Sequence, residues 1–145
     1  MAITDALLTV SDEQAVTATA VSTDSIDLGV NRDIGAGEQL YMLFTCTEAA
    51  TAAGAATVTF EVIASAAGAL TSPVVVGASG AVGKAALTVG EQIAVPIGRQ
   101  TGLGLRYLGA RYTVGTGPLT AGKFTATVVR NVPDTGKFYP TNIVV

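Results

Sequence analysis

The stretch Thr57-Val-Thr-Phe-Glu-Val62 decides the fold class, because polar and apolar residues alternate along it without interruption. Its threonines and glutamate fall on one side and its valines and phenylalanine on the other, as in a β-strand with one buried face. The same period of two recurs in Phe124–Val128, in Ser25–Gly29 and in Val16–Val21. Runs of this length and β-branched content predict short strands rather than helices.

Segments rich in glycine, proline and small polar residues punctuate these runs at fairly even spacing and predict turns. They are Asn31–Gly37, Ala49–Gly54, Ala67–Pro73, Gly77–Gly83, Gly98–Gly104, Gly115–Gly122 and Pro133–Gly136. The pieces between them predict about eight to ten short strands and no substantial helix. We therefore expect an all-β protein, a single-domain jelly roll or similar Greek-key β-sandwich with short N- and C-terminal arms. The expected division is a leader over 1–8, a sandwich over 9–132 and an arm over 133–145.

Length and composition restrict the possible classes of protein. A chain of 145 residues fits one domain, and 49% hydrophobic with 13% charged residues excludes intrinsic disorder. The net charge is −3 and the eight lysines and arginines are scattered, so we expect no nucleic-acid partner. The uncharged run Val62–Gly83 contains too many glycines for a membrane helix, so we expect no membrane partner. A single cysteine and an acidic start at Met1–Asp5 favour synthesis in a reducing cytoplasm without a secretion signal.

Two runs are apolar at successive positions, Leu40–Cys46 and Val74–Val76. A strand that is covered on both faces has this pattern. Each run therefore indicates either a central strand of a two-layer core or a surface that is covered by another subunit or a partner.

The sequence offers little to catalysis or to metal binding. Histidine is absent, which excludes the common nucleophile–histidine sites, and Cys46 lies in the most apolar run, as a buried structural thiol would. Asp24, Asp27 and Asp33 followed by Glu38 supply oxygen ligands but lack the spacing of a calcium loop, and we interpret them as strand and turn residues. We expect no catalytic residue, no cofactor and no metal, and hence no enzyme.

The sequence offers better candidates for a protein–protein interface than for a catalytic or metal site. The strand over Leu105–Val114 carries Arg106, Tyr107 and Arg111, and arginine with tyrosine is enriched where proteins meet. The alternative is that these arginines pair with acidic residues on neighbouring strands. Large apolar residues also occupy both predicted arms, namely Ile3, Leu7 and Leu8 in the leader and Phe138, Tyr139 and Ile143 in the C-terminal arm. The C-terminal arm either folds back on its own sandwich or docks on a neighbouring subunit.

The run from Asp12 to Gly29, followed by Arg32-Asp-Ile-Gly35 and Gly37-Glu-Gln-Leu-Tyr41, resembles the opening of the tailed-phage capsid cement proteins found in a Bordetella phage. The segments Thr51–Thr57 and Arg106–Pro118 are also similar, so that the likeness covers about residues 8–130. The resemblance implies a jelly roll on the exterior of the virion capsid that binds the major capsid protein. It also implies self-association as a homodimer, with a trimer as the alternative, and it supplies no catalytic residues.

The sequence thus predicts a structural virion protein that cements neighbouring major capsid protein subunits. The candidate interface residues are Ile3, Leu7, Leu8, Arg32, Ile34, Tyr41, Arg106, Tyr107, Arg111, Phe138, Tyr139 and Ile143. The alternative is a carbohydrate- or receptor-binding jelly roll on a virion surface, which would need exposed aromatic residues for stacking. Its candidates are the four tyrosines, Tyr41, Tyr107, Tyr112 and Tyr139.

Overall fold

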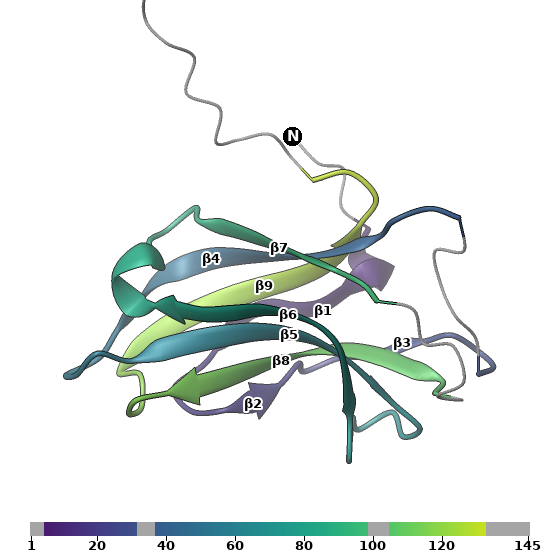
Figure 1. Cartoon of the computed structure of the whole chain (residues 1–145), viewed down its shortest axis with the longest axis horizontal. Helices are drawn as coiled ribbons and strands as arrows, with labels where there is room; N and C mark the ends of the chain where they lie inside the picture. Colours follow the sequence, from purple (N-terminus) through teal and green to yellow (C-terminus); the bar gives the residue numbers. More distant parts are fainter. Residues whose placement is uncertain (1–4, 32–36, 99–104, 133–145) are drawn as a thin grey trace, which may run out of the picture.

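The computed structural model describes residues 5–31, 37–98 and 105–132, and these form two antiparallel β-sheets packed face to face (Figure 1). The first sheet has the order β1-β9-β4-β7, with β1 Thr9–Ala15, β9 Ala121–Val129, β4 Tyr41–Thr51 and β7 Gln92–Pro96. The second has the order β2-β8-β5-β6, with β2 Ala20–Val21, β8 Tyr107–Gly115, β5 Thr57–Ser65 and β6 Val74–Gly83; β3 Ile26–Asp27 also pairs with β8. In the described part of the chain the helical elements are two single 3₁₀ turns, η1 Ala6–Leu8 and η2 Lys84–Ala86.

The order of the strands is that of a jelly roll. The first strand pairs with the last, β2 with β8, β4 with β7, and β5 with β6, so the chain forms one long antiparallel ribbon that is wrapped into two sheets. Two further pairings, of β4 with β9 and of β5 with β8, close the sheets across the ribbon. The predicted all-β sandwich is therefore confirmed.

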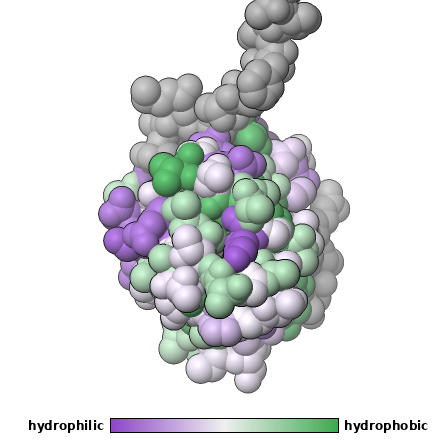
Figure 2. Space-filling view, turned by 90° about the vertical axis from the view of Figure 1, so that its left-hand side faces the viewer, coloured by the Kyte–Doolittle hydropathy of each residue, from purple (hydrophilic) through white to green (hydrophobic). Residues whose placement is uncertain are grey.

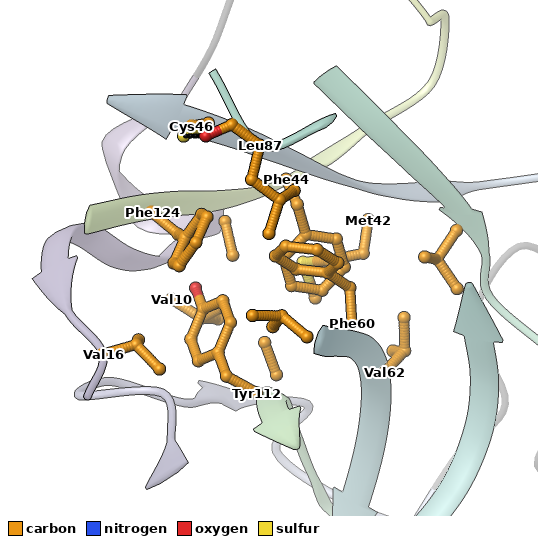
Figure 3. Close-up of a cluster of buried hydrophobic side chains, with 14 of the residues drawn as sticks. Val10, Val16, Met42, Phe44, Cys46, Phe60, Val62, Leu87, Tyr112 and Phe124 are labelled. Atoms are coloured by element: carbon orange, nitrogen blue, oxygen red, sulfur yellow. Dashed lines mark hydrogen bonds between the residues drawn. The ribbon is translucent and has the colours of Figure 1, made fainter. Parts of the chain in front are cut away.

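The core between the sheets is built by the strands with the cleanest alternation. Val58, Phe60 and Val62 of β5 are buried, whereas the threonines and the glutamate between them are half-buried on the outer face. Phe124 and Ala126 of β9 take the equivalent inward positions in the first sheet. The inward residues of both sheets meet in one continuous hydrophobic cluster (Figure 3), so the alternation predicted at Thr57–Val62 and Phe124–Val128 is confirmed.

The centre of the core is a group of four aromatic rings. Phe44 and Phe60, from opposite sheets, have ring centroids 5.1 Å apart, and Phe60 and Phe124 lie 5.2 Å apart in an edge-to-face arrangement. Tyr112 of β8 packs nearly parallel to Phe124 at 5.6 Å. Rings in tilted and edge-to-face contact add to the free energy gained from area burial alone, so this group ties the two sheets together.

The prediction of a turn at Gly77–Gly83 is wrong, because these residues belong to strand β6. The glycines allow close approach rather than chain reversal. The Gly98 amide donates a hydrogen bond to the Val76 carbonyl oxygen (3.0 Å), and a Cβ on either Gly77 or Gly98 would overlap a backbone carbonyl of the neighbouring segment. Gly80, at φ +77°, sits beside an irregularity in the pairing with β5, which is typical of a β-bulge.

Two further strand predictions need correction. Of the two alternatives for Val74–Val76, the central strand of a two-layer core is wrong, because β6 is the edge of its sheet and Val74 and Val75 are exposed. The other alternative, a surface that another subunit or a partner covers, stays a prediction. Val16–Val21 does not form one alternating strand either. Only Ala20–Val21 pairs there, with β8, because the chain crosses from the first sheet to the second between Ala15 and Ala20. Leu40–Cys46, by contrast, does enter the central strand β4, in which Leu43 is buried on the outer face.

None of the described helical segments is long and apolar enough to cross a membrane.

Candidate interaction surfaces

A partly buried ion pair lies on the outer face of the second sheet. Glu61 of β5 and Arg111 of β8 are register partners, and Arg111 Nε donates to Glu61 Oε2 at 2.6 Å. The Thr113 hydroxyl donates to the same carboxylate oxygen at 2.7 Å. Burial opposes ionisation of Glu61, but these hydrogen bonds outweigh it and hold the pKa of Glu61 below its usual value.

A second ion pair lies at the start of β8 and is more exposed. Arg106 donates two hydrogen bonds to the Asp27 carboxylate, at 2.6 and 2.7 Å, and the guanidinium lies 5.3 Å from the ring centre of Tyr107. These bonds lower the pKa of Asp27 to about 2. Both arginines of this strand thus pair with acidic residues on neighbouring strands, which is the alternative that the sequence left open.

The outer face of the first sheet carries a hollow of about 500 Å³ whose lining is about half polar and half apolar. Threonines from β1, β4 and β9 line it, and the hydroxyls of Thr9 and Thr127 lie 3.1 Å apart. Asp12 and Asp24 also line it. Within residues 5–31, 37–98 and 105–132, no three histidine, cysteine, aspartate or glutamate side chains come together as metal ligands would.

An apolar groove of about 270 Å³ opens between the two sheets at the end of the sandwich where β3 lies. The residues that line it come from the η1 turn, from the β3 segment, and from the ends of β4 and β9: Leu8, Ile26, Leu28, Leu40, Val128, Val129 and Arg130. Its lining is almost entirely apolar, which distinguishes it from the threonine-lined hollow.

The Cys46 thiol is buried, as predicted. Its Sγ donates to the Glu48 carbonyl oxygen at 3.2 Å and lies 3.5 Å from the Leu87 carbonyl oxygen. Figure 3 shows the Leu87 contact, and desolvation raises the pKa of the thiol. A protonated thiol held in this way is a poor nucleophile.

The model of the Bbp16 family matches residues 10–128. The chain belongs to this family. The name points to a protein of a Bordetella phage, which agrees with part of the resemblance seen in the sequence. No curated protein matches the chain.

The part that matches Bbp16 runs from Val10 in β1 to Val128 in β9 and thus includes residues of every strand that the structure describes. Of the candidate interface residues inside it, Arg106 and Arg111 are engaged in ion pairs, and Tyr41 and Tyr107 are half-buried. Leu7 and Leu8 precede the matched part; Leu7 is 85% exposed. The remaining candidates lie outside the described residues: Ile3, Arg32, Ile34, Phe138, Tyr139 and Ile143.

Sequence reasoning missed three exposed apolar residues of this Bbp16 family member, Val30, Val89 and Val132. The apolar groove was missed as well, because it is assembled from four separate segments. The uncharged run that contains the exposed valines of β6 was visible in the sequence. The sequence did not show that this run forms the edge of a sheet.

Proposed function

We propose that this protein is a structural virion protein that binds the outer surface of a phage capsid and cements neighbouring major capsid protein subunits. The observation that supports the proposal most strongly is the family match, because it covers the sandwich and its name points to a phage. The proposal includes a location on the capsid exterior, self-association as a homodimer, with a trimer as the alternative, and no enzymatic activity.

The physical properties of the sandwich suit such a role. The core is filled by interlocking aromatic rings, so the domain is a stiff body that can transmit load between its contacts. The surface seen in Figure 2 is mostly weakly apolar or neutral, with only small hydrophilic groups. Few charges have to be desolvated when such a surface is covered, which lowers the cost of binding. A subunit that is held at two capsid sites rebinds readily at one of them, so modest contacts suffice.

The proposal is tested on particles from a phage that lacks the gene. Purified protein is added to these particles, which are then sedimented and heated. Stoichiometric binding and DNA retention to a higher temperature are expected. Failure to co-sediment, or equal heat resistance of complete and deficient particles, would overturn the cementing role.

A matched pair of variants tests the leader as a contact. Leu7 is 85% exposed and belongs to the candidate interface, whereas Val89 is 69% exposed and does not. Leu7→Asp should weaken capsid binding, and Val89→Asp should leave it unchanged. Equal effects would remove the leader from the interface.

The carbohydrate-binding alternative has less support. Tyr112 is fully buried and cannot stack on a sugar, and the Tyr107 ring already has the Arg106 guanidinium over it. In that alternative, soluble sugars would raise the melting temperature of the protein; we expect no shift.

A further inference from the structure

The apolar groove at the β3 end of the sandwich is continuous with the hydrophobic core. Val128 belongs to the core cluster, and Ile26 and Leu40 pack against that cluster from the two sides of the groove. Leu8, at the rim, is 37% exposed. The side chains that line the groove therefore continue directly into the interior, and an apolar group placed there would extend the core.

The chain itself supplies a candidate occupant close by. Arg130 lines the groove, and residues 133–145 follow immediately after Val132. Five of these residues are aromatic or β-branched apolar residues: Phe138, Tyr139, Ile143, Val144 and Val145. A 13-residue segment of this composition has a large apolar surface to bury.

The length and the sequence of the segment suit a return to the groove. Five residues lie between Val132 and Phe138, and the chain from Val132 to Phe138 spans up to about 20 Å when extended. Pro133, Asp134 and Gly136 are residues that favour chain reversal. Because Arg130, two residues before Val132, already lines the groove, a segment of this length starts beside the groove.

We propose that the C-terminal segment 133–145 docks on its own sandwich, with the Phe138 side chain in the apolar groove. A tether that begins at the groove gives the segment an effective concentration in the millimolar range, well above that of a second copy in dilute solution. Phenylalanine suits the site because the groove offers almost no polar atoms, whereas the hydroxyl of Tyr139 would need a partner. The docked segment covers the groove and adds apolar contacts to the core of the same subunit, independently of any capsid contact.

The test is disulfide capture in the full chain with Cys46→Ala, so that no native thiol interferes. Leu28→Cys on the groove is combined with Tyr139→Cys, which keeps Phe138 itself in place; the matched control places the first cysteine at the exposed Val89, in the turn before β7. Mild oxidation should give a disulfide within one chain for the Leu28 pair, which migrates as a monomer on a non-reducing gel, and much less for the Val89 pair. Covalent dimers would show that a second copy fills the groove and would overturn the proposal. Equal or absent cross-linking of both pairs would overturn it too.

A second measurement does not depend on cross-linking. The chain has no tryptophan, so Phe138→Trp introduces a single fluorescent probe. Its emission in the folded protein should be shifted to shorter wavelength than in urea, and Leu28→Asp should move it back toward the solvent-exposed value. Emission from the folded Phe138→Trp protein that equals that of the unfolded chain would refute docking. Both experiments use the purified protein without capsids, so their failure leaves the proposed cementing function to its own test.

Discussion

The Tyr112 hydroxyl gives the sharpest prediction about the core. Tyr112 is fully buried among Phe44, Phe60 and Phe124, and its Oη has no hydrogen-bond partner in the described part of the chain (Figure 3). Ser11 lies near it, but the Ser11 hydroxyl donates instead to Gln14 Oε1 at 2.7 Å. Tyr112→Phe removes the unsatisfied hydroxyl and keeps the ring.

The size of the effect follows from two opposed contributions. An unsatisfied buried polar group costs about 1–3 kcal/mol, and removing one oxygen atom gives up a few dispersion contacts of about 0.1–0.2 kcal/mol each. We expect the free energy of unfolding to rise by about 1 kcal/mol and the melting temperature by roughly 2–4 °C. The matched reverse change, Phe60→Tyr, adds a hydroxyl to a ring that is buried in the hydrophobic cluster and should lower the free energy of unfolding by about 1–3 kcal/mol.

Urea unfolding followed by far-ultraviolet circular dichroism measures both variants at neutral pH. A loss of stability in Tyr112→Phe, in place of the expected gain, would refute the reasoning, since it would mean that the hydroxyl is hydrogen-bonded. A double-mutant cycle with Ser11→Ala would then identify Ser11 as the partner if the two effects are not additive.

The same side chain predicts a pH dependence. Burial raises the pKa of Tyr112 above its usual value. Above a pH of about 10 the unfolded chain loses this proton while the folded chain retains it, so deprotonation favours unfolding and stability falls as the pH rises. The wild type should therefore lose more stability than Tyr112→Phe does when the pH is raised through about 10, the ordinary pKa of a tyrosine in an unfolded chain. Parallel curves would contradict the assignment.

Three further predictions concern separate parts of the sandwich. Cys46→Ala should lower the free energy of unfolding by about 1–2 kcal/mol, and the native thiol should react slowly with maleimide; rapid labelling would contradict its burial. Gly98→Ala should cost about 1–3 kcal/mol because its Cβ overlaps a backbone carbonyl, whereas Gly83→Ala has open space and serves as the control in the same thermal melts. Glu61→Gln should lower the free energy of unfolding at neutral pH. The difference from wild type should shrink as the pH falls through the lowered pKa of Glu61, because Arg111 then loses its charged partner in the wild type too. A difference in stability that stays constant throughout an acid titration would argue against the ion pair.

The sequence predicted the fold where one face of a strand is buried and the other is not. In β5 and β9 that difference forces polar and apolar residues to alternate, so these strands were visible. In β6 the alternation of polar and apolar residues fails, because this edge strand packs partly through close backbone approach and needs glycine for that purpose. Some glycines are needed because a backbone carbonyl from another part of the chain lies against them, and others because they form a turn. The sequence does not distinguish the two.

The surface was less predictable than the core. Whether Arg111 meets Glu61 depends on the register between β5 and β8, and strand register is set by the whole sheet rather than by local residue types. The apolar groove combines segments that are distant in sequence, such as those around Leu8, Leu28 and Val129. No local pattern reports such a combination, so only the geometry could reveal it.

The pairing of the first strand with the last has a consequence for biosynthesis. β9 fits between β1 and β4, and it brings together residues such as Thr9 and Thr127 that are 118 positions apart. Until the ribosome has released β9, the edges of β1 and β4 that will receive it stay open, and such edges pair readily with other chains. Nascent chains of this protein should therefore complete folding only after nearly the whole sandwich has been translated, at the slow rates typical of long-range β topologies, and their solubility should depend on temperature and chaperones in that interval.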